Sequence, residues 1–173
     1  METKDEIINK LDQSGLITFN LEDYYDHNKR LFIDLKDHLY QGFILREREF
    51  RAFVKSNDWS QYREAHVAID ISSDAIVPAW AFMLVAAAVS PFAKKVVKGS
   101  LEDLNKYLYS LALLNIKLSG FKDKVVIVKG CSNVPVPESA YVELCRLLQP
   151  YVKSLSYGEA CSKVPLFKKT SRE

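Results

Sequence analysis

Two cysteines with similar neighbours are the residues of this sequence best suited to chemistry. Cys131 begins the segment CSNVP and Cys161 begins CSKVP, so four of the five residues are the same. Thiolates bind zinc and iron–sulfur clusters, and Glu159 is close enough in the sequence to add an oxygen ligand. The pattern lacks a C-x-x-C pair, and both cysteines could equally be small residues packed in tight turns. A site for zinc or iron is therefore one of two hypotheses for these three residues.

Polar residues in three predicted turns suggest a second kind of site. Hydroxyl groups and the backbone N–H groups at the start of the next helix could together hold a small anion such as phosphate. Such residues also cap helices, and neither G-x-x-x-x-G-K-S/T nor G-x-G-x-x-G occurs in the sequence. The candidate ligand-binding residues are Ser72, Ser73, Asp74, Ser132, Asn133 and Ser162.

Catalysis by a nucleophile at Cys131 or Ser132 would require a histidine base. The available histidines are His27, His38 and His66. His66 begins a predicted strand, which places it at the opposite end of that strand from the turns, and the sequence does not place the other two. Whether the protein is an enzyme therefore stays open.

These turns are positioned by short predicted strands, which alternate with helices from residue 66 onward. The alternation predicts an α/β fold with a mainly parallel sheet and helices on both faces. Ligands of such sheets bind beyond the carboxyl ends of the strands, so we expect the three turns to share one edge. Ser100 and Asp103 form a predicted capping box at the start of the middle helix. The predicted strands are 66–70, 96–98, 125–128 and 155–157, and the predicted helices are 79–94, 101–119 and 138–152.

The N-terminal half is predicted to extend this sheet with a β-hairpin. Residues 31–35 and 39–45 are two apolar runs separated by a short polar segment, which is typical of two strands and their turn. We also expect a short strand at 16–19 and helices at 3–13 and 46–57. The length favours one domain over residues 1–173 with enough chain to bury a core.

Part of this pattern is repeated within the chain. Residues 66–99 aligned with 125–158, without gaps, share eight identical positions. Both segments contain a strand, a polar turn, Val-Pro, a helix, a second proline, a lysine, a strand and a glycine. The sequence therefore predicts two copies of a β-loop-α-β unit.

Residues 75–93 form an uncharged stretch with a proline near each end. A membrane-spanning helix needs ~20 apolar residues, whereas Pro78 and Pro91 limit this helix to about three turns. We therefore expect a helix buried in the protein and no membrane span.

The composition is that of an ordinary globular protein and gives no reason to expect nucleic acid or an anionic membrane as a partner. Lys and Arg total 24 and Asp and Glu total 22, so the net charge is close to +2. The N-terminus has no apolar run of the kind found in secretory signals, and three cysteines are too few for a disulfide framework. We expect a cytoplasmic protein.

Several segments together resemble an uncharacterised family of small bacterial proteins, and the similarity covers nearly the whole chain. They are LFIDLKDHLYQGFILRE, DWSQY, SSDAIVPAWAFML, KGCSNVPVPESAYVEL and YGEACSKVPLFK. The resemblance supplies no catalytic residues. It implies a context of iron–sulfur cluster assembly, which favours the metal hypothesis for Cys131 and Cys161 and makes iron–sulfur assembly proteins candidate partners.

Three functions are compatible with these observations. The first is a metal or iron–sulfur accessory protein. The second is a binding module or enzyme for a small anionic metabolite at the same sheet edge. The third is a homo-oligomeric interaction protein that buries an exposed apolar face against its own copy or another partner.

Overall fold

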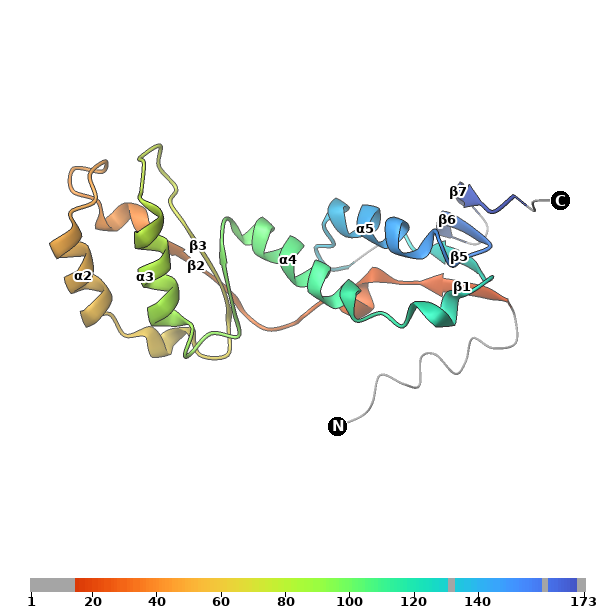
Figure 1. The fold of residues 1–173 in the computed structure, drawn as a ribbon, viewed down its shortest axis with the longest axis horizontal. Helices are drawn as coiled ribbons and strands as arrows, with labels where there is room; N and C mark the ends of the chain where they lie inside the picture. The colour runs from red at the N-terminus through yellow and green to blue at the C-terminus, as the bar shows by residue number, and fades with distance from the viewer. Residues whose placement is uncertain (1–14, 131–132, 160–161, 171–173) are drawn as a thin grey trace. The chain divides into compact units, whose positions relative to one another are not determined.

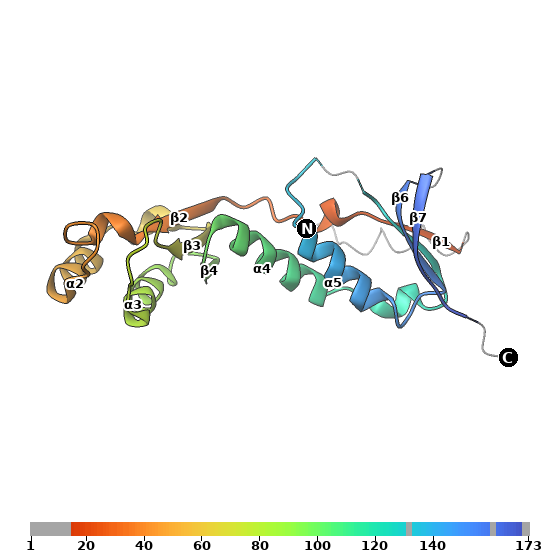
Figure 2. The same ribbon diagram turned by 90° about the horizontal axis from the view of Figure 1, so that it is seen from above.

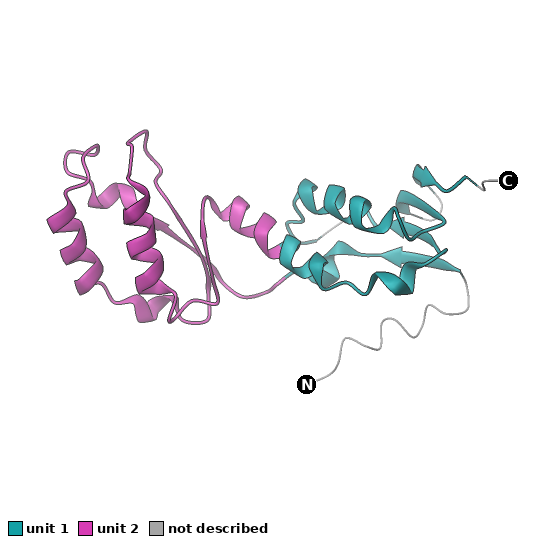
Figure 3. Ribbon diagram, viewed as in Figure 1, with its two compact units in different colours: residues 1–25, 109–173 teal, residues 26–108 magenta. Residues whose placement is uncertain are grey.

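The computed structural model describes residues 15–130, 133–159 and 162–170. The chain divides into two compact units, shown in Figure 3. Unit 2 is the continuous segment 26–108, whereas unit 1 combines residues 1–25 with residues 109–173. That the whole chain behaves as one domain stays a prediction.

Unit 2 is built on a three-stranded parallel sheet in the order β2-β3-β4. Its strands are β2 (Arg30–Asp34), β3 (His66–Asp70) and β4 (Lys95–Lys98). Each strand is rich in β-branched and aliphatic residues, which suits a sheet covered on both faces.

Helices cover both faces of this sheet. Helices α2 (Glu47–Ser56) and α3 (Ala79–Val89) lie side by side on one face (Figures 1 and 2). The first part of α4 (Leu101–Leu114) covers the other face. The core on the α2–α3 side is made by Ile33, Leu35, Phe50, Val54, Trp59, Val67, Ile69, Ala81, Val85 and Val89. The core on the α4 side is made by Ala68, Leu104 and Leu108.

Unit 1 has a four-stranded sheet in the order β1-β5-β6-β7. The strands are β1 (Leu16–Phe19), β5 (Val125–Val128), β6 (Ser154–Glu159) and β7 (Ser162–Lys168). The first three are parallel, and β7 is antiparallel to β6. Helix α5 (Glu138–Leu148) and the last part of α4 pack on the face that carries Phe19, Val126 and Leu155.

The first residues of helices α3, α4 and α5 are determined by the local sequence. Pro78 and Pro137 immediately precede α3 and α5, with extended backbone that a proline favours. The predicted capping box of α4 is confirmed, because Ser100 Oγ accepts the N–H of Asp103 at 3.1 Å and Asp103 accepts the N–H of Ser100 at 2.9 Å.

Elements of the two units occur at equal spacing in the chain. Helices α3 and α5 both have 11 residues and start 59 positions apart, at Ala79 and Glu138. The 3-10 turns η3 (Trp59–Tyr62) and η4 (Leu118–Phe121) are also 59 positions apart. The turns η1 (Leu21–Tyr24) and η2 (Leu35–His38), which follow β1 and β2, are 14 positions apart.

The expected N-terminal hairpin does not form among the described residues. Its first run is β2, but β2 pairs in parallel with β3. The side chain of Asp34 accepts the N–H of Lys36, which starts the turn η2 and ends the strand. Residues 39–45 contain only an isolated bridge between Tyr40 and Ile44.

The expectation of one sheet is also wrong, because the parallel strands are divided between two sheets. The two edges of β3 are occupied by β2 and β4, and the two edges of β5 by β1 and β6. β3 and β5 are therefore central strands of two separate sheets.

The uncharged helix α3 is buried on one side only. Ala81 and Val85 are fully buried, but the side chain of Met83 is 70% exposed. The expectation that this helix is buried all round is therefore wrong. Among the described residues, no helix is long and apolar enough to cross a membrane. Location in the cytoplasm stays a prediction.

Candidate functional site

The predicted metal ligands are only partly described. Cys131, Ser132 and Cys161 lie outside the described residues, and Glu159 is an exposed residue at the end of β6. Within the described ranges, no group of three or more His, Cys, Asp or Glu side chains is arranged to hold a metal ion. The metal hypothesis for the two cysteines stays a prediction.

In unit 2 the predicted turn residues lie directly after β3. Ser72 donates its backbone N–H to Asp34 Oδ1 at 3.1 Å and its hydroxyl to Asp34 Oδ2. The donors that an anion would need at Ser72 therefore already bind a carboxylate of the protein. Ser73 Oγ is buried and has no hydrogen-bond partner among the described residues, and Asp74 is exposed.

In unit 1 the structure describes three of the remaining predicted residues: Asn133 follows β5, Glu159 ends β6 and Ser162 begins β7. The backbone N–H of Asn133 donates to the carboxylate of Glu22. Glu159 and Ser162 face each other across the β6–β7 pair. These residues belong to a different sheet from Ser72, so the prediction that all the turns share one sheet edge is wrong.

Asp34 is a functional-site candidate that the sequence analysis missed. Burial raises the pKa of this carboxyl, but the Ser72 hydroxyl and the N–H groups of Lys36 and Ser72 outweigh burial and lower the pKa to about 2. Two similar segments could have identified the position: F-N-L-E-D beginning at Phe19 and I-D-L-K-D beginning at Ile33. In both, an Asn or Asp caps a 3-10 turn directly after a strand.

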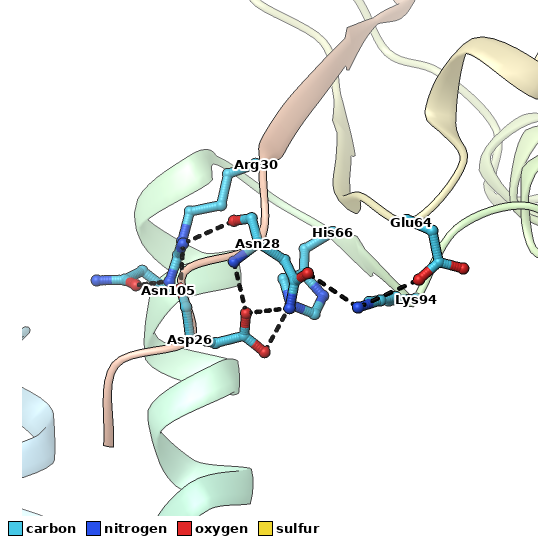
Figure 4. A network of polar contacts seen from close by, with 7 residues as sticks. All are labelled: Asp26, Asn28, Arg30, Glu64, His66, Lys94 and Asn105. Carbon is cyan, nitrogen blue, oxygen red and sulfur yellow. Dashed lines mark hydrogen bonds and ion pairs between the residues drawn. The ribbon is translucent and has the colours of Figure 1, made fainter. Parts of the chain in front are cut away.

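A second polar cluster lies at the opposite end of the unit 2 sheet, around His66 (Figure 4). The side chain of His66 is 3% exposed, and its Nε2 lies 3.0 Å from Asp26 Oδ2 without well-directed hydrogen-bond geometry. Asp26 also accepts the backbone N–H of Asn28 at 2.8 Å. Burial raises the pKa of Asp26, but its contacts with Asn28 and His66 outweigh burial and lower it to about 2.

Neighbouring side chains extend this cluster on both sides. Arg30 donates to Asn105 Oδ1 at 3.2 Å and to the carbonyl oxygen of Asp26 at 2.7 Å. Lys94 donates to Asn28 Oδ1 at 2.9 Å and forms an ion pair with Glu64. A carboxylate beside an imidazole orients acid–base groups in enzymes, but a substrate would have little access to a ring as buried as that of His66. The contacts of Asp26, Asn28 and Arg30 instead hold the segment before β2 against β3 and α4.

A small polar cavity of about 350 Å³ surrounds His38 in unit 2. The ring of His38 stacks on Phe53 with centroids 3.4 Å apart. Burial lowers the pKa of His38 despite the opposing effect of Asp37 and Asp34, which favours a neutral imidazole able to accept a proton. Asp37 and Glu49 supply carboxylates to the same cavity.

An open, apolar groove of about 520 Å³ lies between α5 and β7 in unit 1. Val142 on α5 is 71% exposed, and Val164 and Leu166 on β7 are 58% and 52% exposed. Tyr141, Cys145 and Tyr157 complete the apolar lining, with Arg146 and Gln149 as its polar members. Cys145 is half-buried, packs against the core of unit 1 and also lines this groove.

A second apolar surface is the outer face of α3 in unit 2. Ala79, Met83 and Ala87 are exposed at a spacing of four residues, and the helix has no charged residue. Ile76 in the preceding turn is 93% exposed. Exposed apolar surfaces of this kind mark interaction sites in soluble proteins.

Comparison with known proteins agrees with the resemblance seen in the sequence. No curated protein and no solved structure matched the chain. The model of one family, described as "protein of unknown function (DUF2480)", matches residues 5–169. The chain therefore belongs to the DUF2480 family.

Proposed function

We propose that the chain is a homo-oligomeric interaction protein, in which α3 of one copy binds in the α5–β7 groove of another copy. The observation that carries this proposal is the groove itself, because three large aliphatic side chains from α5 and β7 are more than half exposed around it. Leaving this much apolar surface in water is unfavourable by ~25 cal/mol per Å².

Helix α3 is a suitable occupant of the groove. Its exposed stripe of Ala79, Met83 and Ala87 is narrow and uncharged, so a close approach to another apolar surface leaves no charge unpaired. Met83 is unbranched and flexible, and such side chains fill irregular apolar gaps. One chain thus carries both the protruding apolar helix and the apolar groove, so one further copy can cover the helix and another can cover the groove.

The contact would join two different surfaces, so the interface is heterologous. Heterologous contacts produce closed rings or open chains of subunits. One helix in one groove is small beside a standard interface of ~800 Å² per partner. We therefore expect reversible association that depends on protein concentration.

Sedimentation velocity over a concentration series tests the proposal. Met83→Glu removes the helix surface and Val142→Glu removes the groove surface, and each variant alone should be monomeric. A mixture of the two should form a heterodimer, because it still contains one intact helix and one intact groove. Phe43→Glu is the matched control, since Phe43 is also 71% exposed and lies on neither surface.

Three results would contradict the proposal. The wild-type chain could remain monomeric at the highest concentration tested. Met83→Glu alone could abolish assembly while Val142→Glu has no effect, which would indicate pairing of α3 with α3. Finally, the two variants could fail to associate when mixed although the wild-type chain assembles.

We further propose that the two units descend from a duplicated segment. The equal spacing of α3 and α5, and of η3 and η4, supports this origin. So does the strand register, since His66 opposite Lys95 has its counterpart 59 positions later in Val125 opposite Ser154. Two non-glycine residues with positive φ also correspond: Glu64 at 60° and Asp123 at 59°.

A further inference from the structure

We infer that the outer edge of β4 in unit 2 binds an extended, acidic segment of another protein, which adds to the sheet as an antiparallel strand. This surface is separate from the helix and groove of the proposed assembly. Because elements of the two units correspond at a spacing of 59 positions, a strand pair of unit 1 is the template for this edge.

The template is the β6–β7 pair of unit 1, in which the strand that corresponds to β4 is covered. Strand β7 runs antiparallel to β6 and places Phe167 opposite Leu155 and Pro165 opposite Ser156. Phe167 packs against the core of unit 1. As a result, Leu155 is 0% and Ser156 is 7% exposed.

In unit 2 the corresponding strand has no such cover among the described residues. Strand β4 is the last strand of its sheet and pairs with β3 (Figure 2). Val96 and Val97, the counterparts of Leu155 and Ser156, are only half-buried. Val96 contacts the core on the α3 side and Val97 the core on the α4 side, so a further strand would complete both.

The backbone of β4 is oriented to accept another strand. Gly99 donates its N–H to Ile69 O at 3.0 Å, so the backbone groups of Val97 point in the same direction, toward β3. Backbone groups alternate in direction along a strand, and those of Val96 and Lys98 therefore point to the open side. Such an edge is a template for strand addition.

The charges on β4 define the chemistry of the partner. Lys95 and Lys98 are both exposed and lie on opposite faces of the strand, and Lys98 also forms an ion pair with Asp70 at 3.1 Å. Pairing of β4 with a second β4 in antiparallel register would oppose Lys95 to Lys98, and like charges in opposite positions destabilise a pair. A second copy is thus disfavoured at this edge. A segment with acidic residues opposite the two lysines and apolar residues between them is favoured.

A peptide based on β7 tests this inference. The probe has the sequence of residues 162–168 with Val164→Glu, Pro165→Thr and Lys168→Glu, which puts Glu opposite Lys98 and Lys95 in the register of the β6–β7 pair. The control peptide has Val164→Lys and Pro165→Thr and keeps Lys168. Titration into ¹⁵N-labelled protein should shift the backbone amide signals of Val96 and Lys98 with the probe, and the control should bind about tenfold more weakly.

A protein variant separates strand addition from simple charge attraction. Val96→Pro removes the outward N–H and is tolerated in an edge strand, and it should weaken binding of the probe by about tenfold. Val96→Thr keeps the N–H and the β-branched shape and should bind as the wild type does. Met83→Glu should also bind the probe normally, which separates this inference from the proposed assembly.

Several outcomes would overturn the inference. The largest signal shifts could lie on β6 or on α5 instead of β4. The probe and the control peptide could bind equally well, or Val96→Pro could leave binding unchanged while its spectrum remains that of a folded protein. A fall in the sedimenting mass of the wild-type assembly on Val96→Pro would indicate that a second copy occupies the edge, which also contradicts the inference.

Discussion

Asp34 links the carboxyl ends of two neighbouring strands through a single side chain. It ends β2, caps η2 through the N–H of Lys36, and accepts two hydrogen bonds from Ser72 after β3. Three donors stabilise the ionised form of one carboxyl group. The polar residues of this turn therefore act first on the structure of unit 2.

Ser72→Ala should raise the pKa of Asp34 from about 2 toward the unfolded value of ~3.9. A lowered pKa stabilises the fold above the unfolded pKa, and this contribution is lost as the pH falls toward 2. The variant should therefore lose about 1–2 kcal/mol of unfolding free energy at pH 7 and be less sensitive to pH between 4 and 2. An NMR titration of the Asp34 carboxyl carbon measures the pKa.

Ser73→Ala is the matched control for this prediction. Ser73 Oγ has no hydrogen-bond partner among the described residues, so its loss should leave the pKa of Asp34 unchanged. If the pKa of Asp34 were also unchanged in Ser72→Ala, the hydrogen bonds between Ser72 and Asp34 could not be the cause of the lowered pKa.

At the scale of single elements, the pairing of β6 with β7 depends on Gly158, near the end of β6. Its φ is +115°, and a Cβ atom at this position would lie 2.8 Å from the carbonyl oxygen of Ser162. Any other residue is strained there and collides with the backbone of β7. The pairing of β7 with β6 therefore requires glycine at position 158.

Gly158→Ala should lower the free energy of unfolding by about 1–3 kcal/mol. Gly120→Ala is the control, because no atom lies within 4 Å of the Cβ position and φ is not positive. That change should be neutral or stabilise by up to about 1 kcal/mol. Urea unfolding followed by far-UV circular dichroism is the appropriate measurement, since Trp59 and Trp80 are both in unit 2. Equal stability of the two variants would contradict the strain assigned to Gly158.

The elements that could be predicted from sequence are those whose pattern is local. The strands at His66 and Val125 and the starts of the helices after Pro78 and Pro137 were predicted correctly, because short apolar runs and prolines act within a few residues. The predicted ends of these two helices, at 94 and 152, were wrong, because the helices end at Val89 and Leu148. Strand β7 was missed, because it contains a proline and is defined by its pairing with β6. The prediction of a hairpin was wrong. Asp34 accepts the N–H of Lys36, and this hydrogen bond ends β2 and begins the turn η2.

Contacts between residues that are far apart in the chain could not be predicted from these local patterns. The positions of Ser72 and Asn133 after strands were predicted, but their carboxylate partners Asp34 and Glu22 lie 38 and 111 positions away in the chain. The division into two sheets depends on the pairing of β1 with β5, which is equally non-local. Periodicity reports which face of an element is apolar and does not report which strand it pairs with.

At the scale of the whole molecule, each unit has its own hydrophobic core. Leu144 and Leu148 are fully buried in unit 1, and Val85 and Val89 are fully buried in unit 2. Side chains in such positions make their contacts within one unit. A core mutation should therefore affect one unit more than the other.

Leu144→Ala should destabilise unit 1 by about 2–5 kcal/mol because it leaves a cavity in the core. Hydrogen exchange should become faster in β5, α5 and β6 while β3 and α3 are unchanged. Val85→Ala should produce the opposite pattern, with a smaller effect because fewer carbon atoms are removed. Equal acceleration in both units by either variant would show that the chain unfolds as one cooperative domain.

The discontinuous composition of unit 1 has a consequence for synthesis on the ribosome. A nascent chain contains all of unit 2 once residue 108 has emerged, whereas β1 has to wait for β5, about 110 residues after its own translation. At ~5–20 residues per second, that delay is on the order of ten seconds. During this time the apolar residues Ile17 and Phe19 lack their native neighbours. We therefore expect the segment that contains them to be the main binding site for a chaperone during synthesis.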